Sequence, residues 1–423
     1  MVIVLTLFVL GIIIFVHELG HYLAAKAVGI YIETFSIGFG PKILSFRFWD
    51  TEWVLAAIPF GGYVKMKGDN PEESTFSHDE FLGKSVPQRI FVVLSGPLMN
   101  LILGFTIFFA AYNIVGFTSL PGNKVWQIEK ESIAAQAGFE PGDEILSVDG
   151  KPFKYWDDFF KNIIKPGEHV VTVIRGNSLT ELKVVYKDSL KLGIVPYIPP
   201  VVGAVRKGGP AYKAGLQPGD SVISINGIQV RSWNDMVKII KSHPGEPIKI
   251  SVVRNGKTLT FTVVPEPKVI ENGKKVGLIG VMSPYVRVRV PVGQALEIAV
   301  DRTVSSAFLI FDILGKLVVR KVSIRQIGGP VMIGKVIGES YNYGLYTLLI
   351  VVALISINLF VINIIPFPAL DGWYAILFII EGIIKKPVPL KTQATLQRLG
   401  FVFLIAFMLL ITFFDLTRVF GGK

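Results

Sequence analysis

Two histidines and a glutamate interrupt an apolar stretch near the start of the chain, in the order His17-Glu18-Leu19-Gly20-His21. On an α-helix, side chains four residues apart lie on one face, so His17 and His21 can share a metal ion. The neighbouring Glu18 can take a proton from an attacking water and later deliver it to a leaving amine. This HExxH pattern predicts a hydrolytic zinc (Zn²⁺) site with His17 and His21 as ligands and Glu18 as the catalytic base.

The surroundings of the motif strengthen the metal interpretation. Residues 2–16 are apolar and uncharged, and the apolar character resumes over 22–30, which gives a segment long enough to span a bilayer. Two histidines and a glutamate in such a segment are costly unless they are paired, metal-bound or hydrated. A cleaved signal peptide is the alternative, and the absence of a basic segment before the apolar run disfavours it.

A third ligand is needed, because hydrolytic zinc sites usually combine three protein ligands with one open position. The sequence contains no cysteine, so the remaining ligand must be a histidine or a carboxylate. Asp371 follows a proline-broken segment, Asn363-Ile364-Ile365-Pro366-Phe367-Pro368, at the end of a later apolar run. Broken helices in membranes are tolerated where they line a cavity. Asp371 is therefore the candidate, with a helix N-cap as the alternative role.

Composition predicts a membrane protein with a soluble portion. Hydrophobic residues make up 51% of the 423 residues and charged residues only 18%, which is too apolar for a soluble chain of this length. Four apolar stretches predict about four transmembrane helices. The loop before the last stretch carries Lys385, Lys386, Lys391 and Arg398 against Glu381, which predicts a cytoplasmic location for that loop. The long segment between the second and third stretches and both termini are then extracytoplasmic.

The segment after the first span predicts a β-hairpin. Residues 42–55 alternate in part and turn around Asp50-Thr51. An apolar hairpin next to a membrane either enters the bilayer within the protein or offers a strand edge to an extended substrate. A packed hairpin without a chemical role is the alternative.

An internal repeat occupies the extracytoplasmic region. The sequence AGFEPGDEILSVDG at 137–150 recurs as AGLQPGDSVISING at 214–227, and Trp156 recurs as Trp233. A repeat of this spacing is of domain length rather than solenoid length. Each copy predicts strands, a tight turn and a short helix, and resembles a PDZ domain. That resemblance implies a groove for peptide termini by strand addition; a glycine-rich β domain without a ligand is the alternative.

Basic charge is concentrated beside the membrane. The formal net charge is +11, with about +5 on 198–267 and about +6 on 268–342. Such a region predicts contact with anionic membrane lipids, and too few aromatic residues accompany it for a nucleic-acid surface. Residues 292–319 predict an amphipathic helix on the membrane surface, because Glu297, Asp301, Arg302 and Asp312 break its apolar spacing. A fifth membrane span is the competing interpretation.

Taken together, HELGH in the first span and NIIPFPALDG at the end of a later one resemble the paired signature of the site-2 proteases. The two PDZ-like repeats resemble the bacterial regulator of sigma-E protease group, and the resemblance covers nearly the whole chain. It implies that His17, His21 and Asp371 bind zinc and that Glu18 is the base. It further implies that Asn358, Asn363, Gly38 and Gly40 contact an unwound substrate. Trp373-Tyr374 departs from the glycine and histidine that often stand there.

The sequence therefore predicts a polytopic α-helical membrane protein with two inserted PDZ-like α+β domains and a membrane-associated β-hairpin. The expected segments are a first span 1–30, a loop with the hairpin 31–88, a second span 89–117, PDZ-like domains 120–190 and 200–266, an interfacial helix 290–320, a third span 343–366, a cytoplasmic loop 367–399 and a fourth span 400–417.

The expected activity is intramembrane proteolysis of single-pass membrane proteins, of the anti-sigma-factor or signal-peptide-remnant type, in the bacterial inner membrane. A non-catalytic scaffold presenting two PDZ domains is the alternative, but no ligand or base is missing. A zinc transporter would need more intramembrane acids and histidines than the chain contains.

Overall fold

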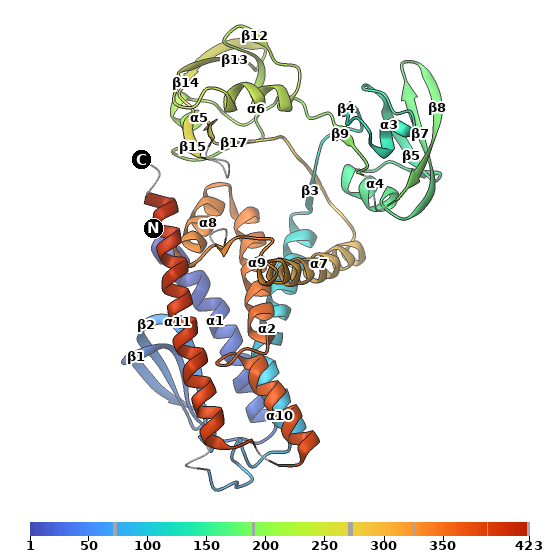
Figure 1. Cartoon of the computed structure of the whole chain (residues 1–423). Helices are drawn as coiled ribbons and strands as arrows, with labels where there is room; N and C mark the ends of the chain where they lie inside the picture. Colours follow the sequence, from blue (N-terminus) through green and yellow to red (C-terminus); the bar gives the residue numbers. More distant parts are fainter. Residues whose placement is uncertain (71–73, 188–190, 270–273, 325–326, 387, 421–423) are drawn as a thin grey trace. The chain divides into compact units, whose positions relative to one another are not determined.

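The computed structural model describes residues 1–70, 74–187, 191–269, 274–324, 327–386 and 388–420. The chain forms two compact units. The first combines Met1–Val115 with Val290–Lys423, and the second is the inserted segment Gly116–Arg289. Figure 1 shows the helices of the first unit and the two sheet-containing domains of the second.

Four helices of the first unit are long and apolar enough to cross a membrane, which confirms the predicted number. They are α1 (Val2–Ala27), α2 (Val86–Ile114), α9 (Leu345–Ile364) and the part Thr395–Arg418 of α11 (Leu390–Phe420). Helix α2 packs against both α1 and α9 (Figure 1). It begins three residues before the expected second span and stops at Ile114, because Gly116 has a left-handed φ of +83° and Phe117 enters a strand.

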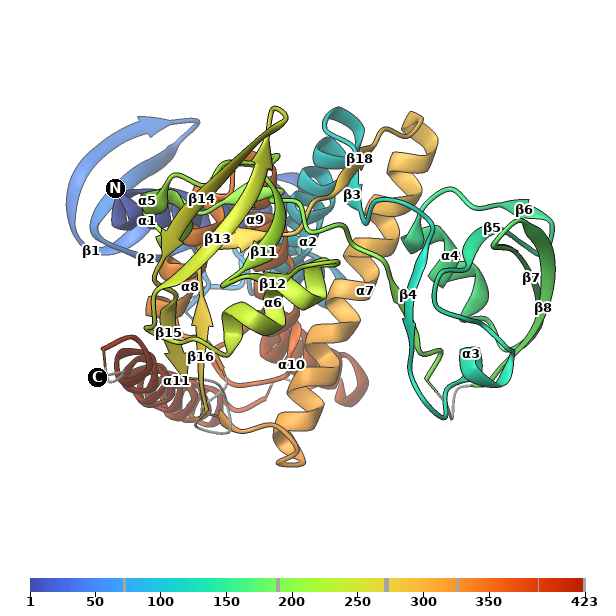
Figure 2. The ribbon, with the colours of Figure 1, turned by 90° about the horizontal axis from the view of Figure 1, so that it is seen from above.

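Among its described residues this unit also contains the helices α7 (Val292–Val318), α8 (Pro330–Asn342) and α10 (Asp371–Ile384). Helix α7 crosses α2 and α9 at a steep angle, and Figure 2 shows its full length. Its small side chains Ala295 and Ala299 are buried, whereas Phe308 is 70% exposed. Helix α8, which the sequence did not predict, begins at Pro330 directly after Gly328-Gly329.

The predicted hairpin is present and longer than expected, with strands β1 (Ile32–Phe48) and β2 (Thr51–Met66). Its two-residue turn, Trp49-Asp50, has positive φ at both positions (49° and 58°), as a tight hairpin turn requires. Strand β2 folds back along β1, so residues 34–37 pair with 52–55 on one side and with 62–65 on the other. The arm 62–66 thus forms one edge of a small three-stranded arrangement.

Aromatic packing fixes the base of this hairpin against α1. The Phe35 ring stacks on Trp53 at 4.4 Å between centroids and meets Tyr22 of α1 edge-on at 5.7 Å. Phe35 is fully buried. The outer half of β1 is different, since Leu44 and Phe46 are each 64% exposed. The hairpin is therefore anchored at its base and presents apolar side chains outward toward its tip.

The inserted unit contains two domains with the same sheet topology. The first has the sheet order β6-β5-β7-β8 and the second β12-β11-β13-β14. The first domain is built from β4 (Val125–Ile128), α3 (Ile133–Gln136), β5 (Glu144–Val148), β6 (Lys151–Pro152), α4 (Trp156–Ile163), β7 (Gly167–Arg175), β8 (Ser178–Tyr186) and β9 (Ile194–Pro196). Residues 188–190, at the expected end of this domain, lie outside the described residues.

The second domain continues beyond its expected end at 266. Its elements are β10 (Ala204–Val205), α5 (Pro210–Ala214), β11 (Ser221–Ile225), β12 (Ile228–Gln229), α6 (Trp233–Lys241), β13 (Ile248–Arg254), β14 (Lys257–Val263), β15 (Glu266–Val269), β16 (Lys275–Leu278) and β17 (Val281–Met282). Strand β17 pairs with β10, as β9 pairs with β4 in the first domain. The partner of β10 therefore lies after the expected end of the second domain. Strands β3 (Phe117–Ser119) and β18 (Val286–Val288) pair where the chain enters and leaves the unit.

A duplicated ion pair reflects the sequence repeat. In the first domain Arg175 donates to both carboxylate oxygens of the fully buried Asp143, at 2.8 and 2.9 Å. In the second, Arg254 donates to both oxygens of the equally buried Asp220, at 2.6 and 2.7 Å. Each arginine also reaches a backbone carbonyl at the end of the preceding helical turn. The Pro-Gly-Asp segment of each repeat is thus fastened to the far end of β7 or β13.

We expect Asp220→Ala to loosen the second domain, because it removes the buried partner of the Arg254 guanidinium. The measurement is hydrogen–deuterium exchange of the full chain, in which the amides of β11 and β13 should exchange at least about tenfold faster. The control is Glu266→Ala, which removes the more exposed pair with Arg206 in the same domain. Unchanged protection in β11 and β13 of Asp220→Ala would contradict a stabilising role for the pair.

Candidate metal centre

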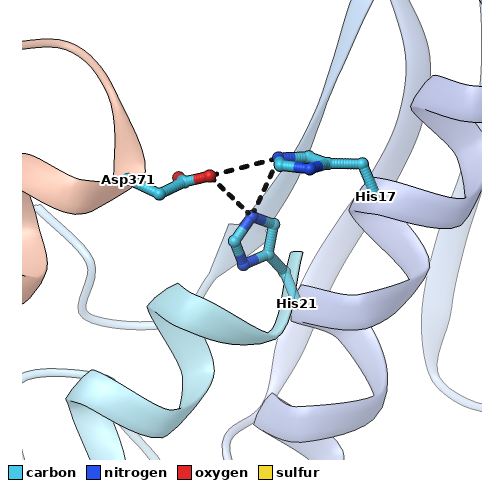
Figure 3. A group of neighbouring side chains, drawn as sticks. All are labelled: His17, His21 and Asp371. Atoms are coloured by element: carbon cyan, nitrogen blue, oxygen red, sulfur yellow. Dashed lines mark hydrogen bonds and ion pairs between the residues drawn. The ribbon is translucent and has the colours of Figure 1, made fainter. Parts of the chain in front are cut away.

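The helical spacing of the HExxH motif places two imidazoles together inside the first unit. His17 and His21 lie on the same face of α1, with their Nε2 atoms 3.3 Å apart and their rings edge to face (Figure 3). Both residues and Glu18 are buried, each with 9% of its surface exposed. A buried pair of imidazoles facing each other through the same ring nitrogen is suited to sharing a cation.

Helix α10 contributes the carboxylate that completes the group. The prolines at 366 and 368 end the path of α9, and α10 then starts at Asp371 itself. The Oδ2 atom of Asp371 lies 3.2 Å from His17 Nε2 and 3.6 Å from His21 Nε2 (Figure 3). The ligand atoms of the three residues all lie within 4.8 Å of one another. The donor set of two imidazoles and one carboxylate fits Zn²⁺, and it combines residues from the two ends of the chain.

Helix α2 orients both imidazole rings from the opposite side. His21 Nδ1 lies 2.9 Å from the carbonyl oxygen of Val92, and His17 Nδ1 lies 3.1 Å from the side-chain amide of Asn100. Each ring therefore uses Nδ1 to contact α2 and turns Nε2 toward Asp371. Neither Val92 nor Asn100 was predicted from the sequence. The available signal for Asn100 was a polar side chain within an apolar span.

Two glycines allow α1 and α2 to approach this closely. A Cβ atom at Gly20 would lie 2.4 Å from the Ser95 carbonyl oxygen, and one at Gly96 would lie 2.2 Å from His21 Nε2. Real Cβ atoms do not approach other atoms so closely, so only glycine fits at either position. The backbone of α2 thus forms a wall directly behind the His21 ring.

A cavity of about 650 Å³ opens at the metal group. It is lined by His17, Glu18, His21 and Asp371, by apolar side chains of several elements, and by polar side chains of Asp69, Asn70, Tyr374, Gln393 and Gln397. Burial raises the pKa of the Asp69 carboxyl above its usual range. Tyr374, one of the two residues that depart from the site-2 pattern, lies on this wall together with Gln397 of α11. The cavity provides a polar, buried space beside Glu18.

The edge arm of the hairpin forms another wall of the cavity. Gly62, Tyr63, Val64 and Met66 of β2 all line it. A Cβ at Gly62 would lie 2.8 Å from Glu18 Cγ, so the strand backbone passes directly beside the Glu18 side chain. The strand edge predicted for the substrate was residues 42–55, and these do not line this cavity.

The four residues expected to contact substrate lie elsewhere in the described structure. Asn358 and Asn363 are half-buried on α9, and neither lines the cavity. Gly38 and Gly40 lie in β1 with φ of 91° and 86°, at irregular positions of the β1–β2 pairing. At Gly38 a Cβ would lie 2.7 Å from the Ile58 carbonyl oxygen, so these glycines shape the bend of the strand.

A buried ion pair fastens the helix that carries Asp371. Glu381 of α10 accepts from Arg89 of α2 at 2.8 Å, with only 8% and 11% of the two side chains exposed. The Arg89 guanidinium also lies over the Phe378 ring, 4.5 Å from its centroid. Since α2 also holds both imidazoles, this pair ties the third member of the metal group to the same helix.

We expect Glu381→Ala to lower the melting temperature of the full chain by more than about 5 °C, since the Arg89 charge loses its buried partner. Zinc affinity should fall with it. The double variant Arg89→Glu with Glu381→Arg should recover most of both losses. Asp312→Ala, which removes an exposed pair with Lys316, serves as the control. Equal behaviour of Glu381→Ala and the control would show that the pair does not position α10.

Comparisons with known proteins identify the family of this chain. The model of peptidase family M50 matches residues 5–407. The regulator of sigma-E protease of Escherichia coli is 34% identical over 97% of each chain. The zinc metalloprotease RasP of Geobacillus kaustophilus is 32% identical, again over 97% of each chain. Among solved structures, the PDZ domain of an SdrC-like protein from Listeria monocytogenes matches 21% of this chain at 23% identity, with a TM-score of 0.18 that is too low to assign a fold.

The family match extends from the first membrane helix, past both histidines and Asp371, into the last. The relatives are named as zinc metalloproteases and sigma-E regulators, and the chain shares their length. The predicted enzyme class, Zn²⁺ cofactor and inner-membrane location are therefore confirmed. The chain belongs to peptidase family M50 and is an intramembrane zinc metalloprotease of the site-2 type.

Proposed function

We propose that His17, His21 and Asp371 hold the zinc ion and that Glu18 is the catalytic base. The observation that carries this assignment is the convergence of the three ligand atoms within 4.8 Å, beside a cavity that Glu18 also lines. When bound there, zinc supplies the Lewis acidity that activates water and stabilises negative charge on a scissile carbonyl. Glu18 removes the proton of the attacking water and passes it to the departing amine.

We assign the arm Gly62–Met66 the task of holding the substrate chain. A peptide bond within a transmembrane helix is shielded by intrahelical hydrogen bonds, so the segment must be extended before cleavage. An edge strand offers backbone groups that replace those bonds. This arm lines the cavity and passes against Glu18, which would place a paired chain next to the base. Asn358, Asn363, Gly38 and Gly40 remain candidates for contacts farther along the substrate.

The substrates we propose are single-pass membrane proteins. Relatives of this chain are named regulators of sigma-E, and an anti-sigma factor is a substrate class consistent with that name. A signal-peptide remnant has the same single apolar helix. The released cytoplasmic fragment would then alter transcription.

The inserted unit provides two candidate sites for peptide termini. Both domains have a four-stranded sheet of identical order and a short helix, which supports the PDZ-like assignment. We propose that the pair lies extracytoplasmically and excludes membrane proteins whose outer domain is still intact. Deleting 120–282, the two domains as the structure delimits them, should enlarge the set of cleaved proteins. An unchanged set would argue against this gating role.

Helix α7 is proposed to lie at the extracytoplasmic membrane surface. Its exposed residues Leu296, Val300, Val304 and Phe308 follow a four-residue spacing, on a different side of the helix from the buried Ala295 and Ala299. Such a stripe suits the boundary between headgroups and acyl chains. The basic residues of 268–342 would contact anionic lipids on the same side.

The test of the proposed function is cleavage of a single-span reporter by the detergent-purified full chain. Cleavage should stop after zinc removal with a chelator and return when zinc is restored. The untreated sample should contain about one zinc ion per chain. Zinc-loaded protein that never cleaves would favour the scaffold alternative, and cleavage that a chelator does not stop would contradict the zinc mechanism.

A further inference from the structure

Asn100 occupies a fully buried position on α2, directly behind the metal group. Its amide nitrogen, Nδ2, is placed 3.1 Å from His17 Nδ1, on the side of the ring away from Asp371. The amide oxygen, Oδ1, has no hydrogen-bond partner among the described residues. A polar side chain with 0% exposure in an apolar helix pair is costly, so this one contact needs a physical reason.

The reason follows from the chemistry of a neutral imidazole, which carries one N–H and one lone pair. A histidine that offers Nε2 to a metal must carry its hydrogen on Nδ1, and that N–H needs an acceptor. For His21 the acceptor is the Val92 carbonyl oxygen at 2.9 Å. For His17 the group in contact with Nδ1 is the Asn100 amide. An amide presents its oxygen or its nitrogen on rotation by half a turn, and only the oxygen accepts.

We propose that the Asn100 amide oxygen accepts a hydrogen bond from His17 Nδ1–H and so fixes His17 in the tautomer that binds zinc through Nε2. Asn100 is then a positioning residue, and the inference rests on the proposed assignment of His17 as a ligand. Either orientation of the amide leaves one of its atoms without a partner among the described residues. The number of satisfied hydrogen bonds therefore does not select an orientation. The hydrogen that His17 must carry on Nδ1 selects the one in which the Asn100 amide oxygen faces the ring.

Packing of α2 against α9 fixes the position of Asn100 along the axis of α2. The Ser356 hydroxyl of α9 donates to the Asn100 backbone carbonyl at 2.7 Å, and both residues are fully buried. One turn further along α2, a Cβ at Gly104 would lie 2.6 Å from the Ile357 side chain. Helix α2 therefore cannot slide along α9 without breaking close contacts, and the amide keeps its distance to His17.

The experiment measures zinc affinity of the detergent-purified full chain by competition with a chelator. Asn100→Leu removes the acceptor with little change in volume, and zinc binding should weaken about 10- to 100-fold. Asn100→Asp keeps an oxygen acceptor at the same place, and its affinity should stay within about threefold of wild type or exceed it. Thr106→Ala, which removes an exposed hydroxyl elsewhere on α2, should bind within about twofold of wild type.

A purely structural role for Asn100 predicts the opposite order. A new buried carboxylate would then be worse than leucine, so weaker zinc binding by Asn100→Asp than by Asn100→Leu overturns the proposal. Wild-type affinity in Asn100→Leu, or an equal loss in Thr106→Ala, overturns it as well. If Asn100→Leu does not fold, Asn100→Asp still decides, because loss of zinc from a folded Asn100→Asp protein contradicts the acceptor role.

Failure of the underlying assignment would look different. If wild type binds no zinc, or His17→Ala binds it as tightly as wild type, then His17 is not a ligand, whatever the Asn100 variants do. The absorption spectrum of the cobalt-substituted protein adds a readout of ligand geometry. Wild type and Asn100→Asp should share one spectrum, and Asn100→Leu should differ in band position or intensity; identical spectra for all three overturn the proposal.

Discussion

Replacing Glu18 with glutamine is expected to reduce cleavage by about 10³-fold or more while zinc stays near one ion per chain. The amide keeps the shape of the carboxylate but cannot take a proton from water. Shape matters here, since the Gly62 backbone leaves little space around Glu18 Cγ. The three proposed ligands are untouched. Single-turnover cleavage of a single-span reporter and elemental analysis of the same sample measure the two quantities.

Glu33→Gln is the matched control for this variant. Glu33 lies in the adjoining hairpin, is paired with Lys65 and is substantially exposed, so the substitution should leave cleavage unchanged. Cleavage by Glu18→Gln within about tenfold of wild type would remove Glu18 from the role of base. Loss of cleavage together with loss of zinc would instead make Glu18 a ligand.

Replacing Gly96 with alanine is expected to weaken zinc binding by at least about 100-fold, and cleavage with it. The added Cβ would lie 2.2 Å from His21 Nε2 and 2.5 Å from the adjacent ring carbon. The ring cannot retreat without breaking the 2.9 Å contact between Nδ1 and the Val92 carbonyl oxygen. Overlaps of this size force one of the two groups to move, and the imidazole ring of His21 moves more easily than the backbone of α2. Chelator competition measures the affinity.

Gly11→Ala gives the comparison for helix propensity. It introduces the same methyl group into α1, where nothing lies within 4 Å, and should leave zinc binding unchanged. Alanine favours helix over glycine, so loss of zinc in Gly96→Ala cannot arise from weaker helix formation in α2. Normal zinc affinity in Gly96→Ala would mean that α1 and α2 lie farther apart than described, and the orientation of His21 by α2 would have to be abandoned.

The metal group could be predicted from sequence because its signals are local. His17 and His21 are one helical turn apart, and Asp371 follows a proline pair that must interrupt a helix. Asn100 and Gly96 carry no such signal. An asparagine in a membrane helix suits any interhelical hydrogen bond, and a glycine suits any close crossing. Their roles depend on which face of α2 meets α1, and hydropathy does not specify that face.

Pairing between strand segments that are far apart in the sequence could not be predicted either. The sequence predicted a hairpin around Asp50, and the tight turn is there. The return of β2 along the other side of β1, which brings Gly62 to Glu18, depends on tertiary contacts of Phe35 and Trp53. Likewise, the recognisable sequence repeat ends before β17, so the repeat did not indicate which strand pairs with β10.

The joining of α1 and α10 in one metal group also sets an order of events during synthesis. A nascent chain that has inserted α1 and α2 and folded the inserted unit carries both histidines and Glu18, yet it lacks Asp371 and the Arg89–Glu381 tether. With the proposed ligands, we therefore expect the protease to become competent only when α10 has been made. Chains that stop before α10 should be inert toward the apolar helices that surround them at the insertion site.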